Sequence, residues 1–79
     1  MDTNEKQTLI QEKEQRIRDL TADLSSAASP IGDWKVIKIY EARMKQEADP
    51  YNFEELTAAR QAARDEINRL QTEIAELEQ

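Results

Sequence analysis

Apolar side chains recur with alternating steps of four and three residues near both ends of this 79-residue chain. Such steps place side chains on one face of an α-helix, as in the heptad seam of a coiled coil. The first seam comprises Ile10, Lys13, Ile17, Leu20, Leu24 and Ala27. The second comprises Leu56, Arg60, Ala63, Ile67, Leu70, Ile74 and Leu77. The spacing therefore predicts two long helices, each with one mostly apolar seam.

Capping signals predict where these two helices begin. Asp2 stands three residues before Glu5, and Asn52 stands three residues before Glu55, the spacing of a capping box. The expected spans are about 3–28 and about 53–79.

The break between them is expected at residues 29–33. Ser29, Pro30 and Gly32 interrupt the first helix, because proline lacks the amide proton and glycine accepts a positive φ. Asp33 is the expected N-cap of a short helix over about 33–47, although Ser29 with Pro30 could start it earlier. Pro50 and its neighbours then predict a second turn over residues 48–52.

The apolar residues of the short helix lie on two different faces. One stripe is expected to pack inward against small residues at the start of the last helix. The stripe contains Val36, Ile37, Tyr40 and Met44, and the small residues are Ala58, Ala59, Ala62 and Ala63. Trp34 and Ile39 point away from the stripe, and Trp34 fits either a protein interface or the end of an intrachain core.

These elements predict a single all-α domain over residues 1–79 with a long-short-long arrangement. In the preferred form the long helices pair antiparallel as a coiled-coil hairpin, and the short helix crosses the closed end. That form sets Ile10 near Leu77, Ile17 near Leu70 and Leu24 near Ala63. The alternative is a staggered up-down-up bundle whose protruding seams need another chain.

Two polar residues, Lys13 and Arg60, interrupt the seams. A polar seam residue can fix helix register at some cost in stability, or its long side chain can reach past the seam edge to water. Both interpretations remain open from the sequence.

Composition excludes several chemistries. There is no cysteine for a disulfide or thiolate site and no histidine for the commonest general base, so we expect no enzyme activity, catalytic residue, metal site or cofactor. Adjacent carboxylates such as Glu54 and Glu55 are best explained as a solvated face. The net charge of −6 disfavours direct binding to nucleic acid.

The sequence also predicts where the chain resides. The charged first 25 residues lack the apolar core of a signal peptide, and no apolar run approaches the ~20 residues of a membrane span. We expect a cytoplasmic protein that does not bind a membrane. With only 79 residues to form a core, oligomerisation as a dimer or higher is expected.

The middle of the chain carries a distinctive set of residues. They are Ile31, Gly32, Asp33, Trp34 and Lys35, then Tyr40 and Glu41, then Pro50 and Tyr51, and finally Arg60, Gln61, Arg64 and Asp65. With them, residues 29–70 resemble a group of small, largely uncharacterised helical proteins encoded in phage and prophage genomes. The resemblance implies a phage or prophage origin, a virion-associated location as an alternative to the cytoplasm, and a helical interaction role.

The expected function is that of a non-enzymatic structural or interaction protein. It would be a small acidic coiled-coil module that associates with itself or binds a partner protein. The alternative is a phage-encoded acidic inhibitor that occupies the nucleic-acid channel of a host enzyme. The candidate interaction residues are Trp34, Ile39, Ile67, Leu70, Ile74 and Leu77.

Overall fold

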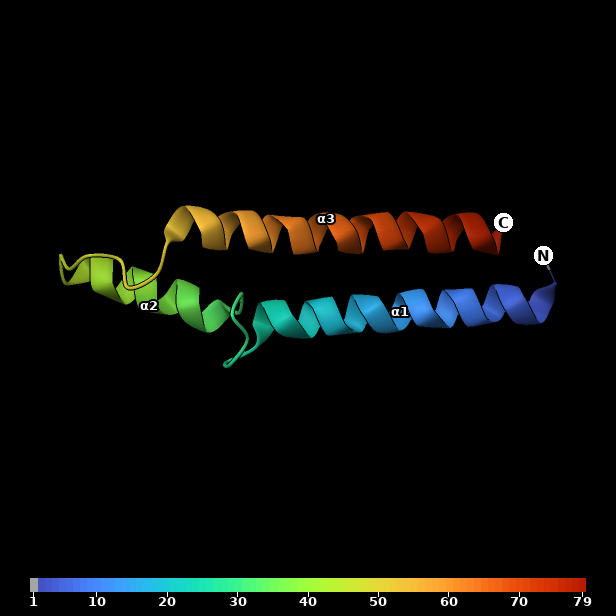
Figure 1. Ribbon diagram of the computed structural model, residues 1–79, viewed down its shortest axis with the longest axis horizontal. Coiled ribbons are helices and arrows are strands. Elements are labelled where there is room, and N and C mark those ends of the chain that lie inside the picture. The colour runs from blue at the N-terminus through green and yellow to red at the C-terminus, as the bar shows by residue number, and fades with distance from the viewer. Residues whose placement is uncertain (1) are drawn as a thin grey trace.

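A computed structural model describes residues 2–79 and shows three α-helices (Figure 1). They are α1 (Thr3–Ser25), α2 (Asp33–Met44) and α3 (Phe53–Glu78). Each regular element within the described residues is a helix, so the all-α, long-short-long prediction is confirmed.

The two long helices pack side by side in opposite directions, with both chain ends at the same end of a rod that measures 58 × 18 × 14 Å (Figure 1). As residue numbers increase along α1, the residue numbers of their hydrogen-bonded partners decrease along α3, which is the pattern of two antiparallel helices. The partner pairs are Lys6 with Gln79, Lys13 with Glu73, Arg16 with Glu66, and Leu24 with Arg60. The antiparallel hairpin is therefore the observed arrangement, and the up-down-up bundle is not.

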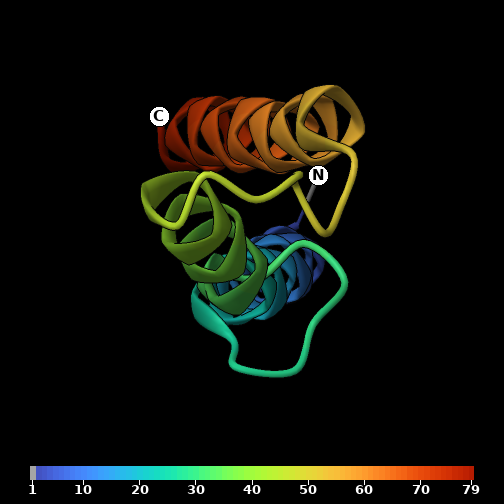
Figure 2. The same ribbon diagram turned by 90° about the vertical axis from the view of Figure 1, so that its left-hand side faces the viewer.

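The short helix does not cross the closed end of the hairpin, as we expected. Instead α2 continues in the direction of α1 beyond the turn, and α3 begins alongside it (Figures 1 and 2). The chain reverses only after α2, through residues 45–52. As a result, α1 and α2 form one broken rod, and the distal part of α2 lies at one end of the molecule.

The core of the hairpin lies between α1 and α3. Leu20, Ala63 and Leu70 are buried together, and four partly buried residues pack against them: Ile17, Leu24, Ile31 and Ile67. The predicted neighbours Ile17 with Leu70, and Leu24 with Ala63, thus lie in one cluster. Burying a leucine side chain fully contributes about 1.5–3 kcal/mol, so a few such residues can hold two helices together.

Side-chain caps begin both long helices where the sequence predicted them. The Asp2 carboxylate accepts a hydrogen bond from the Glu5 amide at 2.9 Å, and the Asn52 side-chain oxygen accepts one from the Glu55 amide at 3.0 Å. Each cap satisfies one of the amides that lack a partner in the first turn.

The first helix ends at Ser25, three residues earlier than expected. The Ser26 hydroxyl oxygen accepts hydrogen bonds from the amides of Ala28 and Ser29 at 2.9 and 3.0 Å. A serine side chain that bonds to nearby amides competes with the helical pattern and turns the chain.

Gly32 follows in this turn and serves as the N-cap of α2, so Asp33 is the first helical residue and not the cap. Its φ is −73°, which corrects the expectation of a positive value. The need for glycine is steric, because a Cβ atom would collide with the Ser26 carbonyl oxygen and press on the Trp34 ring.

The short helix also ends earlier than expected, at Met44 instead of about residue 47. Gln46 adopts a φ of 62°, and its amide donates to the Arg43 carbonyl at 3.1 Å. The Glu47 amide donates to the Ala42 carbonyl at 2.8 Å. This pair of bonds is the Schellman ending of a helix, here built on glutamine where glycine is the usual residue.

Candidate functional site

The short helix presents to solvent the face that was expected to be buried. Ile39 is 3% exposed and Ala42 is also buried, whereas Ile37, Tyr40 and Met44 are 54%, 64% and 69% exposed. Val36 on the same stripe is also exposed. The prediction for this face was wrong, and Ile39 is removed from the candidate interaction residues because it lies in the interior.

The reason lies in the position of α2. Because it extends α1 and does not lie across the hairpin, neighbours cover only the strip that carries Ile39 and Ala42. In α3, of the four alanines expected to receive the bulky stripe, only Ala63 is buried, and it faces α1. The other three, Ala58, Ala59 and Ala62, are exposed.

Within residues 2–79, four of the five exposed large hydrophobic side chains lie on α2 and the fifth is the first residue of α3. We name this set the α2 apolar surface, and it comprises Val36, Ile37, Tyr40, Met44 and Phe53. Phe53 joins it through Arg43, whose guanidinium carbon lies 4.6 Å from the centre of the Phe53 ring. Phe53 was not among the predicted interaction residues, because it lies ten positions after Arg43, beyond a turn, and helical periodicity does not extend across a turn. A concentrated apolar region on an otherwise charged protein is typical of an interaction site.

Charged side chains border the α2 apolar surface on both flanks. At 100° per residue, Lys38, Glu41 and Lys45 lie along one flank, and Lys38 Nζ is 4.0 Å from Glu41 Oε2. On the other flank, Arg43 binds Asp49 through two hydrogen bonds of 2.8 and 2.9 Å. This hydrogen-bonded pair lowers the pKa of the Asp49 carboxyl and raises the pKa of the Arg43 guanidinium.

Trp34 is half-buried and engaged within its own chain. Its indole Nε1 donates a 2.6 Å hydrogen bond to the Ser29 carbonyl, and its ring meets Tyr51 edge to face at 5.4 Å. The Lys35 ammonium lies 5.7 Å from the centre of the Trp34 ring and 4.7 Å from that of Tyr51. Trp34 therefore closes the turn between α1 and α2, as the intrachain alternative for it supposed.

The other candidate interaction residues lie along the seam of α3. Leu70 is buried against α1, and Ile67 packs on the same cluster. Ile74 and Leu77 are partly buried further along the helix. The structure thus uses this seam for intrachain packing, and it does not bring these residues together with Trp34.

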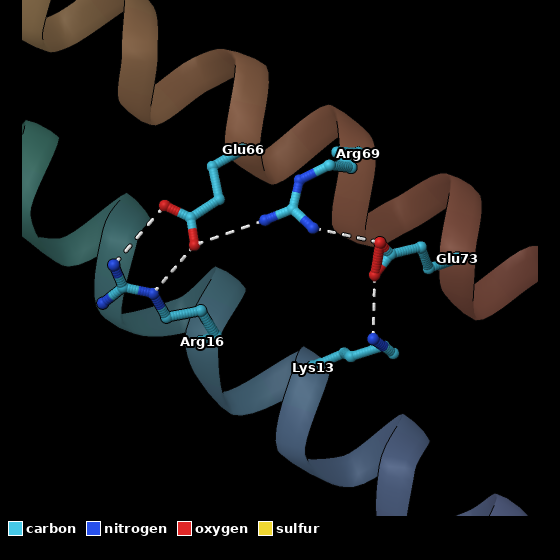
Figure 3. Close-up of polar contacts among 5 residues, drawn as sticks. All are labelled: Lys13, Arg16, Glu66, Arg69 and Glu73. Carbon is cyan, nitrogen blue, oxygen red and sulfur yellow. Dashed lines mark hydrogen bonds and ion pairs between the residues drawn. The ribbon is translucent and has the colours of Figure 1, made fainter.

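A chain of ion pairs connects the two long helices along one side of the hairpin, from Lys13 and Arg16 on α1 to Glu66, Arg69 and Glu73 on α3 (Figure 3). Lys13 Nζ lies 2.8 Å from Glu73 Oε1, and Arg16 Nε lies 3.2 Å from Glu66 Oε1. Arg69 bridges the two glutamates at 3.7 and 3.1 Å. The Lys13 hydrogen bond lowers the pKa of Glu73, and the Glu66 hydrogen bond raises the pKa of Arg16. The Lys13 contact crosses the hairpin, where it favours one helix register.

Arg60, the other polar seam residue, points into the closed end of the hairpin. Its side chain is 13% exposed and donates to the carbonyls of Leu24 and Ile31 at 3.1 and 2.7 Å. It also donates to the Asp33 carboxylate at 2.7 Å. One guanidinium therefore binds the end of α1, the turn and the start of α2.

A depression of about 340 Å³ lies beside this turn, lined by Pro30, Ile31, Lys35, Tyr51, Asn52, Glu55, Leu56 and Ala59. Residues 2–79 contain no group of three potential metal ligands. Within the same residues, no helix combines the length and apolarity needed to cross a bilayer.

Comparison with known proteins gives no match: no family model, no curated protein and no solved structure is significantly similar to the chain.

Proposed function

We propose that this chain is a non-enzymatic interaction protein that uses the α2 apolar surface to associate with itself or to bind a partner protein. The observation that carries the proposal is the gathering of large exposed apolar side chains at one end of the rod, among them Ile37, Tyr40 and Met44. Removing such side chains from water is the main favourable term in most protein associations. The hairpin of α1 and α3 serves as a rigid support that presents this surface.

The carboxylates of the hairpin support a non-enzymatic role. Glu66 and Glu73 are partly exposed, and each forms ion pairs with basic side chains. A general acid or base, in contrast, needs a carboxyl group within hydrogen-bonding reach of a bound substrate. The ion pairs of these two glutamates with Lys13 and Arg16 connect α3 to α1.

The proposal is tested by a pull-down in which the wild type, Ile37→Asp and Ala62→Asp are compared. A bacterial lysate is appropriate, because the resemblance implies a phage or prophage origin. Ala62 is exposed on α3, away from the α2 apolar surface, so its variant controls for the added charge. We expect self-association, or a protein retained on the bait, that persists in Ala62→Asp and is lost in Ile37→Asp. If neither depends on Ile37, the proposal fails.

The acidic inhibitor is a second candidate, and one observation favours it. Residues 33–52 hold four basic and four acidic side chains, so the whole net charge of −6 lies on the rest of the chain, mainly on α1 and α3. Against it, Glu66 and Glu73 already bind basic side chains and are less able to replace phosphates. The same pull-down separates the two candidates, because an inhibitor would retain a nucleic-acid enzyme equally well on the wild type and on Ile37→Asp.

A further inference from the structure

The chain reverses its direction in a very short segment at the tip of α2. We name this segment, residues 45–47, the hinge. Beyond the hinge the chain runs back alongside α2, so that the Tyr51 ring meets the Trp34 ring near the start of that helix (Figure 1). Residues 48–79 are therefore connected covalently to the rest of the protein at a single tight turn.

The hinge holds one residue in an unfavourable backbone conformation. Gln46 has a φ of 62°, in the left-handed region that residues with a Cβ atom seldom adopt. Two backbone hydrogen bonds hold it there, from the Gln46 amide to the Arg43 carbonyl at 3.1 Å and from the Glu47 amide to the Ala42 carbonyl at 2.8 Å. A short hinge under strain favours an open form in which the two sides of the hinge separate.

The contacts that hold the two sides together do not depend on the hinge. Leu20 of α1 is buried with Leu70 of α3, and Arg60 of α3 donates to the Ile31 carbonyl at 2.7 Å. Each of these contacts joins a residue before the hinge to a residue after it. The same contacts therefore form when the two residues belong to different copies of the chain, which is the condition for domain swapping.

We propose that two copies of this chain open their hinges and exchange residues 48–79, so that α3 of each copy packs against α1 of the other. Opening the hinge breaks its two backbone hydrogen bonds, whose groups water satisfies at this exposed turn, and it relieves the strain at Gln46. The exchange does not cover the α2 apolar surface, so this inference is independent of the proposed function.

The exchanged dimer has a distinctive shape and concentration dependence. The tips of the two α2 helices meet end to end, and the dimer is a rod about 116 Å long, twice the 58 Å of one copy. Closing within one chain costs no association entropy, so the monomer predominates at low concentration and the dimer forms at high concentration.

Refolding of the full chain from urea, at 10 µM and at 1 mM, tests the proposal. Size-exclusion chromatography and small-angle scattering should show a monomer at 10 µM and a dimer with a maximum dimension near 116 Å at 1 mM. The isolated dimer should revert slowly after dilution, because α3 must leave α1 before each chain closes. A dimer held only by surface contacts would dissociate quickly.

An ion pair of the wild-type chain reports which copy supplies each helix. Lys13 Nζ lies 2.8 Å from Glu73 Oε1, so a carbodiimide can couple this amine to this carboxylate. Unlabelled chains and chains labelled with a heavy nitrogen isotope are unfolded, mixed and refolded at 1 mM. In the dimer we expect about half of the cross-linked peptides to join a light segment to a heavy one. A dimer without exchange would give only all-light and all-heavy peptides.

Substitutions at residue 46 test whether strain favours the exchange. Gln46→Gly should weaken dimerisation about thirtyfold relative to Gln46→Ala, since about 1 kcal/mol of strain is removed from the closed form of each of the two copies. Gln46→Pro should be mainly dimeric. Proline fixes φ near −65° and lacks the amide that donates to the Arg43 carbonyl, so it is incompatible with the closed hinge.

Three results would overturn the inference. A wild-type chain that stays monomeric after refolding at 1 mM does not exchange. A dimer without mixed cross-linked peptides uses another interface. Equal dimerisation of Gln46→Gly and Gln46→Ala would show that hinge strain is not the cause. Ile37→Asp should exchange as the wild type does, so a failure of the proposed function is detected separately.

Discussion

The guanidinium of Arg60 lies 2.7 Å from the carboxylate of Asp33, and this contact ties α3 to the first turn of α2. The same guanidinium also binds the Leu24 carbonyl near the end of α1, where carbonyls lack helical partners. Arg60 is therefore the point at which all three helices are joined. Its hydrogen bonds hold the turn in the form that sends α2 outward along the rod.

Replacing Arg60 should destabilise the fold. Arg60→Ala leaves the Leu24 and Ile31 carbonyls without this donor, and we expect the free energy of unfolding to fall by about 2–3 kcal/mol. Urea denaturation followed by circular dichroism measures the change. Arg64 is an exposed arginine on the same helix, and Arg64→Ala should lower the free energy of unfolding by less than about 0.5 kcal/mol. Equal losses in the two variants would contradict a special role for Arg60.

Gly32→Ala should destabilise the turn by about 1–3 kcal/mol, because the new methyl group collides with the rigid Ser26 carbonyl. The backbone φ of −73° is open to alanine, so the effect is steric. Thermal denaturation measures the loss. An unchanged melting temperature would show that the turn opens readily and that the close approach of Ser26 is not required.

Trp34→Phe should weaken folding and leave association unchanged. The variant keeps an aromatic ring beside Tyr51 but loses the 2.6 Å hydrogen bond to the Ser29 carbonyl, at a cost of about 1 kcal/mol. Urea denaturation and sedimentation of one sample separate the two effects. Weaker association with unchanged folding stability would show that Trp34 contributes to a protein interface and not to the intrachain core.

Gln46→Gly should stabilise the protein by about 1 kcal/mol. Residue 46 adopts a φ of 62°, a conformation that costs a residue with a Cβ roughly 1–2 kcal/mol more than glycine. Gln46→Ala is the control and should change the stability little, since alanine also carries a Cβ. If the glycine variant melts below the alanine variant, the Schellman ending is not what holds this turn.

Stability should decrease as the pH falls through the acid range. The pKa of Glu73 is lowered from its ordinary value of 4.5 by its hydrogen bond to Lys13. A lowered pKa in the folded state contributes stability above the unfolded value and loses it as the pH falls through the folded value. Melting temperatures between pH 6 and pH 3 measure the effect. Glu73→Gln should show a shallower decline, and profiles of equal slope would exclude the ion pair as a source.

The sequence alone determined the two long helices and favoured their antiparallel pairing, although a staggered up-down-up bundle stayed open. The seam spacing predicted one apolar face for each helix, and Asp2 and Asn52 marked where the helices begin. The contacts of the folded chain decided between the two arrangements. The buried positions of Leu20 and Leu70 followed from the same spacing. These features depend on local hydrogen bonds and on the period of the helix, which neighbouring residues in the chain specify.

Only the tertiary structure decided the direction of α2 and which of its faces meets solvent. Ile39 on one side and the stripe from Val36 to Met44 on the other are both apolar, so periodicity could not tell which would be covered. That choice depended on the path of the turn, which the local contacts of Ser26 and Gly32 and the long-range contact of Arg60 with Ile31 hold in place. The spacing of apolar residues carries no information about this path. Apolar spacing shows which side chains can be buried together, and burial itself requires a neighbour that only the folded chain supplies.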